Sequence, residues 1–115
     1  MSDIPSVDMV VLDDLREILE DQLHEILNEF KDEIPFYKKK FEKFYSENDV
    51  DNLIMLSHSI KSSSGNLGLM RISDYCRQIE EGLRNNPNMD LSALVESSQQ
   101  ELVVLIGEID SLVSG

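Results

Sequence analysis

The residues with the clearest chemical potential are His58 and Lys61, which are three positions apart in a segment with a helical pattern. A neutral imidazole has a free nitrogen lone pair and is a good nucleophile near neutral pH. It can accept a phosphoryl group directly, and a lysine one helical turn away can stabilise charge on the phosphoryl oxygens. This pair therefore indicates phosphoryl transfer through histidine.

The helical pattern places His58 on the solvent side of its helix. The face expected to meet the core carries Leu53, Leu56, Ile60, Ser64 and Leu67. His58 points about 175° away from that face, with Gly65 within about 20° and Ser62 within about 40° of it. Because glycine inside a helix costs about 1 kcal/mol relative to alanine, we expect Gly65 to leave room for another backbone to approach the imidazole.

Apolar residues surround the histidine on the same helical wheel. Ile54, Met55 and Leu69 all project within about 60° of His58. A solvated helix face normally carries charged residues, so apolar residues around a polar centre predict a protein-docking surface. The alternative is that a neighbouring helix covers Ile54 and Leu69.

Other kinds of phosphotransfer machinery are missing from the sequence. No glycine-rich loop suits a nucleotide, and no pair of acids near His58 suggests a Mg²⁺ site. We therefore expect the chain to receive its phosphoryl group from a partner, without kinase activity of its own.

Composition excludes several functional classes. The chain has 115 residues, with 23 acidic and 10 Lys and Arg residues, for a net charge of -13. This charge argues against nucleic acid and anionic membranes as partners. The single cysteine, Cys76, excludes an internal disulfide, and we expect it to be buried and unreactive. With no signal peptide and no membrane-spanning apolar run, we expect a cytoplasmic protein.

Basic residues gather in two places in this acidic chain. Between residues 54 and 84, four bases outnumber three acids, which would suit an anionic partner. The other group is Lys38, Lys39, Lys40 and Lys43, which we interpret as a solvated helix face. His24 has no partner motif and is interpreted as a surface histidine.

The hydrophobic pattern predicts helices throughout and one domain over residues 1–115. The apolar residues Leu12, Leu15, Ile18 and Leu19 predict a short first helix, with Asp13 or Asp14 near its start. A long helix follows over residues 23–45, bent at Pro35 but in phase across it. The later helices are expected at about 50–67 with Asp49 as N-cap, at about 70–84, and from about 90 onwards. These elements predict an all-α antiparallel four-helix bundle with an additional short N-terminal helix.

The segment His58-Ser-Ile-Lys61-Ser-Ser-Ser-Gly65-Asn-Leu-Gly68 resembles the signature of histidine-containing phosphotransfer (HPt) domains. That signature has a His, a Lys three positions on, small residues, a Gly seven positions on, and often a second Gly three positions later. Residues 15–19, 30–35 and 74–80 also lie where such domains carry equivalent segments. The resemblance thus covers nearly the whole chain, and residues 58–68 carry its specific part.

The resemblance implies roles for single residues. His58 would be phosphorylated on Nε2, Lys61 would stabilise the phosphoryl group, and Gly65, with Gly68, would leave space for a docking partner. Glu80 resembles the position from which an acid or amide bonds the other imidazole nitrogen and fixes the tautomer; the alternative is a solvated carboxylate. Three serines replace the more usual Gly and Ala after Lys61, and the first of them, Ser62, could donate a hydrogen bond to the phosphoryl group.

The resemblance also implies partners. They would be receiver domains, one in a hybrid sensor kinase and one in a downstream regulator, and each would bind its own Mg²⁺. The chain itself would be a monomeric phosphorelay intermediate that needs no cofactor or metal. Two alternatives stay open: an adaptor that binds receivers without being phosphorylated, and the phosphotransfer module of a larger kinase. The starting Met1 and the helix that ends the chain favour a stand-alone protein.

Overall fold

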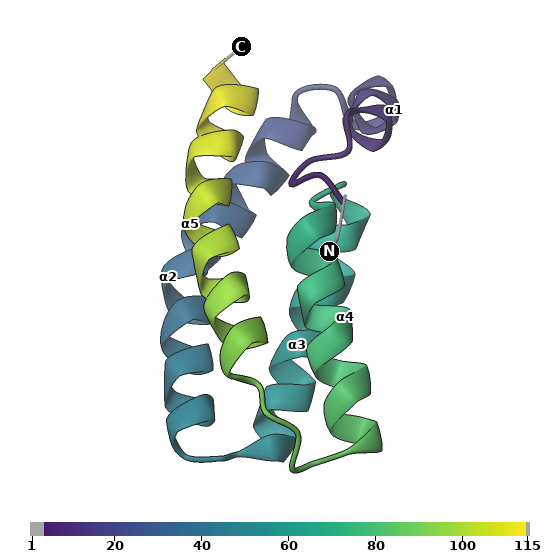
Figure 1. The fold of residues 1–115 in the computed structure, drawn as a ribbon. Coiled ribbons are helices and arrows are strands. Elements are labelled where there is room, and N and C mark those ends of the chain that lie inside the picture. Colours follow the sequence, from purple (N-terminus) through teal and green to yellow (C-terminus); the bar gives the residue numbers. More distant parts are fainter. Residues whose placement is uncertain (1–3, 115) are drawn as a thin grey trace.

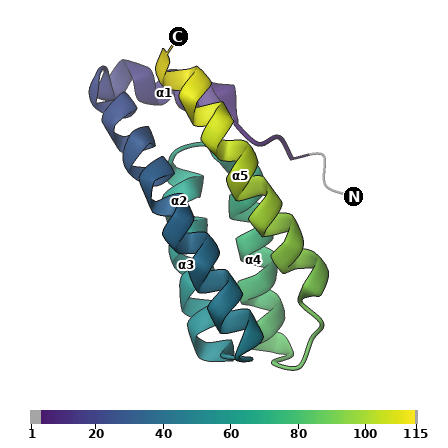
Figure 2. The ribbon, with the colours of Figure 1, turned by 90° about the vertical axis from the view of Figure 1, so that its left-hand side faces the viewer.

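Four long helices lie side by side, and one short helix crosses their end (Figures 1 and 2). The computed structural model describes residues 4–114. Its helices are α1 (Met9–Leu19), α2 (Gln22–Ser46), α3 (Val50–Asn66), α4 (Met70–Asn85) and α5 (Ser92–Ser114). In the bundle, α2 and α4 each contact both α3 and α5, and consecutive helices run in opposite directions. The predicted all-α antiparallel bundle with a short N-terminal helix is confirmed.

Aspartate side chains cap the N-termini of α1 and α3. Asp49 starts α3 as predicted, because its side chain accepts a hydrogen bond from the Asn52 N–H at 3.3 Å. Asp13 or Asp14 was predicted near the start of α1, but neither residue lies in its first turn. The N-cap of α1 is Asp8, whose carboxylate accepts from the Val10 N–H at 3.0 Å.

The long helix α2 continues without a break through Pro35. Proline removes one backbone donor, but apolar side chains on both sides of it, including Ile34 and Phe41, are fully buried in the core. The expectation of one rod rather than two separate helices is confirmed, and the bend at Pro35 stays a prediction. Of the four apolar residues that predicted α1, Ile18 lies in solvent and is 76% exposed. Only one face of α1 meets the bundle, and Leu12 fills that contact.

The turn between α3 and α4 corrects two further expectations. Leu69 is fully buried, and Gly68 is buried with its carbonyl accepting a 2.7 Å hydrogen bond from the Asp8 N–H. Neither residue can belong to a docking surface. The helical wheel misplaced Leu69 because α3 ends at Asn66 and the chain turns at Gly68, where φ is +75°.

The segment before α1 is attached to α4 by Arg71. Its Nε donates to the Ile4 carbonyl at 2.9 Å, and its Nη1 donates to Ser6 Oγ at 3.2 Å. The same guanidinium lies 3.6 Å from the buried carboxylate of Glu101, whose pKa is raised by burial. These contacts hold the N-terminal segment against the bundle.

None of the helices within residues 4–114 combines the length and the apolar character that a bilayer span requires.

The glycine at the α3–α4 turn predicts a stability difference between two alanine variants. A Cβ on Gly68 would lie 3.1 Å from the Asp8 carbonyl oxygen and from Val11 Cβ, on a backbone with positive φ. Gly68→Ala should therefore destabilise the protein by about 1–3 kcal/mol. A Cβ on Gly107 of α5 would meet nothing within 4 Å, so Gly107→Ala should stabilise it by about 0.5–1 kcal/mol. Urea unfolding measures both, and a Gly68→Ala midpoint equal to wild type would contradict the account of this turn.

Candidate functional site

His58 projects from the middle of α3 into solvent. Its side chain is 57% exposed, and one of its neighbours on α3, Met55, is 67% exposed. Ile54 is only partly exposed, because it packs against the core. The expected apolar surroundings of the imidazole thus consist of Met55 and part of Ile54, without Leu69.

Glu80 on α4 lies beside the imidazole. The His58 Nδ1 and Glu80 Oε2 atoms are 3.0 Å apart, and the Glu80 side chain is only 6% exposed. The sequence left two interpretations of Glu80 open: a partner of the imidazole or a solvated carboxylate. The second is therefore wrong. A glutamate in a helix is usually exposed. Glu80 is buried because α4 packs closely against α3.

Two basic side chains neutralise the Glu80 carboxylate. Lys61 Nζ donates to Oε1 at 2.7 Å, while Arg84 donates to Oε2 from Nη2 at 3.1 Å and from Nε at 3.2 Å. The hydrogen bond from Lys61, opposed by burial and aided by Arg84 and His58, lowers the pKa of Glu80 to about 2. The carboxylate is therefore ionised at physiological pH.

An ionised Glu80 determines which imidazole nitrogen is protonated. A carboxylate can only accept hydrogen bonds, so Nδ1 of His58 must carry the hydrogen that joins it to Oε2. In the neutral ring the lone pair then lies on Nε2. The site thus presents one nucleophilic nitrogen in a defined orientation.

Gly65 lies where α3 and α4 approach each other. A Cβ at this position would lie 3.2 Å from Ser73 Oγ, which donates a 2.9 Å hydrogen bond to the Lys61 carbonyl. The missing side chain at Gly65 therefore lets Ser73 of α4 lie close to α3. This close approach helps to place Glu80 against His58.

Of the two remaining site residues, one was predicted from the sequence and the other was not. Ser62 is exposed and makes no hydrogen bond within residues 4–114, so its hydroxyl is available. Arg84 was not predicted as a site residue. Its spacing from Glu80, i to i+4 on one helix, was the signal that could have identified it.

No group of three or more His, Cys, Asp or Glu residues in the described part of the chain is arranged to hold a metal ion. Cys76 is buried, and burial raises the pKa of its thiol, as expected for an unreactive cysteine.

Comparisons with known proteins place this geometry in context. The family model described as the Hpt domain matches residues 10–114. Among solved structures, the chain is similar to histidine-containing phosphotransfer protein B (HptB) from Pseudomonas aeruginosa PAO1, with a TM-score of 0.88 and 24% sequence identity over 96% of each chain. That similarity bears on the fold. The comparison with curated proteins gives no significant match.

The depressed pKa of Glu80 predicts how stability depends on pH. Its charge stabilises the fold fully above the ordinary pKa of 4.5, and this contribution is lost as the pH falls towards 2. At pH 6, Glu80→Gln should lower the free energy of unfolding by about 1–2 kcal/mol, a value reduced by solvent screening of the exposed partners. The difference from wild type should shrink between pH 4.5 and pH 2. A difference that stays constant over this range in urea titrations would contradict the assignment.

Proposed function

The chain belongs to the Hpt domain family, and from that premise we propose that it is a phosphorelay intermediate that carries the phosphoryl group on His58. Members of this family are histidine phosphocarriers of two-component signalling and not kinases. In our proposal, the chain accepts the group from an aspartyl phosphate of one receiver domain and passes it to the aspartate of another. The exposed imidazole bonded to a buried, ionised Glu80 is the observation that carries this proposal.

The transfer step is an in-line displacement at phosphorus. The Nε2 lone pair of His58 forms a bond to phosphorus while the bond to the aspartyl oxygen breaks, and the aspartate leaves as a carboxylate. Since Nδ1 keeps its hydrogen, the phosphorylated ring is positively charged. The carboxylate of Glu80, 3.0 Å from Nδ1, stabilises that charge.

Lys61 and Arg84 each bind a different oxygen of the Glu80 carboxylate. Lys61 bonds Oε1, and Arg84 bonds Oε2. Lys61 can therefore turn towards the phosphoryl oxygens while Arg84 keeps Glu80 ionised and in place. Ser62, with its free hydroxyl one turn beyond His58, is suited to donate a further hydrogen bond to the phosphoryl group.

The receiver domain is the partner in this proposal and supplies the rest of the apparatus. It contributes the aspartate and binds the Mg²⁺ ion, so this chain acts without a cofactor. Met55 and the exposed part of Ile54 offer apolar contact beside His58, and Gly65 keeps the approach to the imidazole open. Lys61 and Arg84 would meet the acidic active site of the receiver.

The wider setting belongs to the same proposal. The donor would be the receiver of a hybrid sensor kinase, and the acceptor would be that of a downstream regulator. We propose that the chain acts as a monomer in the cytoplasm.

The phosphorylated residue can be tested by substitution. His58→Gln should fold normally and take no phosphoryl group from a phosphorylated receiver domain, because Gln offers no nucleophilic nitrogen. His24→Gln is the matched control, since His24 lies on α2 and not on α3 or α4, and it should be labelled like wild type. Radiolabelled phosphate on the protein should be acid-labile and base-stable. A wild-type protein that binds receivers but never becomes labelled would support the adaptor alternative instead.

The orienting role of Glu80 can be tested through the imidazole tautomer. Glu80→Ala removes the acceptor, so the hydrogen of neutral His58 should distribute over both nitrogens in ¹⁵N NMR spectra. The rate of phosphoryl transfer should fall about tenfold, equivalent to about 1.4 kcal/mol. Arg84→Ala is the control, because it leaves the Glu80 carboxylate and Lys61 in place. It should lower the transfer rate less than Glu80→Ala does. An unchanged tautomer and rate in Glu80→Ala would contradict this role.

A further inference from the structure

Lys61 is attached to α4 through both its backbone and its side chain. Its carbonyl accepts a hydrogen bond from Ser73 Oγ at 2.9 Å, and its Nζ donates to Glu80 Oε1 at 2.7 Å. Ser73 and Glu80 are seven residues apart on α4, so two helical turns place them on one face of the helix. The transfer site is thus connected to α4 through Ser73 as well as through Glu80.

Open space lies beside the side chain of Lys61. A cavity of about 480 Å³ is lined by Lys61 and Ser73, and Ile4 and Pro5 of the N-terminal segment form another part of its wall. The Lys61 side chain is 30% exposed. Close packing restrains a side chain only where neighbours fill the surrounding space. The direction of this side chain therefore depends on the backbone from which it starts and on its ion pair with Glu80.

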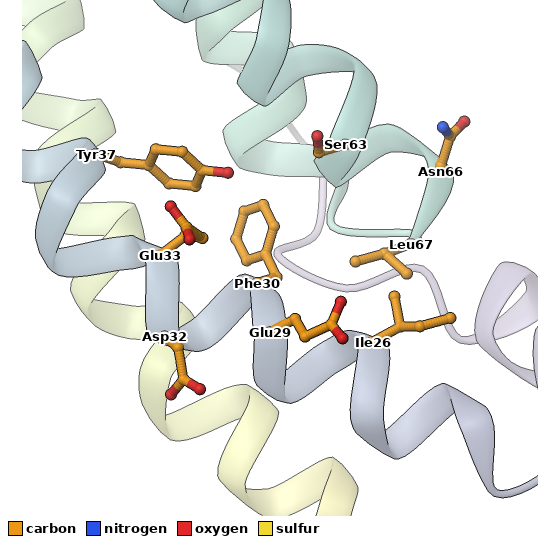
Figure 3. Close-up of a pocket in the computed structure, with 9 residues that line it drawn as sticks. All are labelled: Ile26, Glu29, Phe30, Asp32, Glu33, Tyr37, Ser63, Asn66 and Leu67. Carbon is orange, nitrogen blue, oxygen red and sulfur yellow. The ribbon is translucent and has the colours of Figure 1, made fainter.

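The side of α3 that faces α2 is also loosely packed at this level. A cavity of about 600 Å³ is lined there by Ser63 and Asn66, two positions before and one after Gly65. Figure 3 shows Phe30 and Tyr37 from α2 on one side of this cavity and Ser63 and Asn66 from α3 on the other. The contact of α3 with α4 is more extensive than its contact with α2. The position of this part of α3 therefore depends mainly on α4.

The contact with α4 requires a very small residue at position 65. A Cβ on Gly65 would lie 3.2 Å from Ser73 Oγ, which is shorter than such contacts normally are, and 4.0 Å from Ser73 Cβ, which is an ordinary contact. If the hydroxyl rotates away, it loses its bond to the Lys61 carbonyl. Gly65→Ala should therefore conflict with the Ser73 hydroxyl and yet fit beside Ser73→Ala.

We propose that Ser73 is a positioning residue of the phosphoryl-transfer site, and that Gly65 is required by Ser73, apart from the room that it leaves for a partner. The Ser73 hydroxyl fixes the Lys61 backbone against α4, so that Nζ can reach the phosphoryl oxygens while Glu80 stays beside His58. The inference rests on the proposed phosphorelay function and adds a residue to its site. Because Ser73 acts through Lys61 on the transfer chemistry, its loss should slow phosphorylation even by a donor that does not dock.

Phosphoramidate tests the chemistry without docking. Its phosphorus bonds to His58 Nε2 as its P–N bond breaks and ammonia leaves. Ser73→Ala should lower the rate of this reaction about fivefold, while Ser73→Thr, which retains the hydroxyl, should stay within about twofold of wild type. Ser46→Ala is the matched control, because Ser46 Oγ also donates a 2.9 Å hydrogen bond to a backbone carbonyl, at the end of α2. It should react at the wild-type rate.

A double-mutant cycle tests the link between Gly65 and Ser73. Gly65→Ala alone should lower the phosphoramidate rate about fivefold, because it displaces the Ser73 hydroxyl. In the Ser73→Ala background it should cause no further loss, since the hydroxyl is already absent. Urea unfolding should show the same coupling: Gly65→Ala should raise the midpoint in the Ser73→Ala background but not in wild type.

Gly107→Ala is the control for the cycle. A Cβ on Gly107 would meet nothing within 4 Å, so this substitution should have the same effect on the urea midpoint in both backgrounds and no effect on the phosphoramidate rate. All rates are measured without urea, on variants whose circular dichroism shows the wild-type helix content. A slower reaction then reports the site and not a loss of folded protein.

The outcomes separate this inference from the proposed function. A wild-type phosphoramidate rate in Ser73→Ala would overturn the positioning role. Losses from Gly65→Ala that appear only with a receiver domain, and equally in both backgrounds, would overturn the link to Ser73, because the glycine would then serve the partner alone. If phosphoramidate labels wild-type His58 but no receiver domain of a panel does, the relay function is overturned and the phosphoramidate rates still decide the role of Ser73. Failure of both donors to label His58 would overturn both.

Discussion

The hydrogen bond between His58 Nδ1 and the Glu80 carboxylate is the interaction on which the rest of the site depends. It joins an exposed side chain on α3 to a buried one on α4, so it exists only if the two helices pack closely and in one register. A buried carboxylate is costly unless it is paired. Lys61 and Arg84 provide that pairing, and they do so from the same two helices.

In the proposed relay, the packing of α3 against α4 therefore serves function as well as structure. Gly65 allows Ser73 to approach and bond the backbone of α3. The turn at Gly68 reverses the chain within a few residues and is fixed to the start of α1 by the Asp8 hydrogen bond. These features fix the position of α4 relative to α3, and this position keeps the Glu80 carboxylate beside the imidazole of His58. The result is a ring fixed by one nitrogen and open to a partner at the other.

The sequence predicted those features that depend on one helix at a time. The wheel placed His58 outward because α3 is regular around it, and Asp49 was identified because N-capping is local. It failed where a helix ended or where a second element intervened. Leu69 lies beyond the end of α3, so the helical wheel of α3 does not give its direction. Asp13 and Asp14 were expected near the start of α1, but its N-cap is Asp8 in the segment that meets the α3–α4 turn. Arg84 was missed because its importance comes from Glu80, whose burial depends on a neighbouring helix.

The central claim is that Glu80 directs the phosphoryl group to a single nitrogen of His58. ¹⁵N and ³¹P NMR of the phosphorylated, ¹⁵N-histidine-labelled protein tests it most directly. The account predicts phosphorus coupled to Nε2 of His58, with the hydrogen retained on Nδ1. Phosphorus coupled to Nδ1, or found on no histidine, would contradict it.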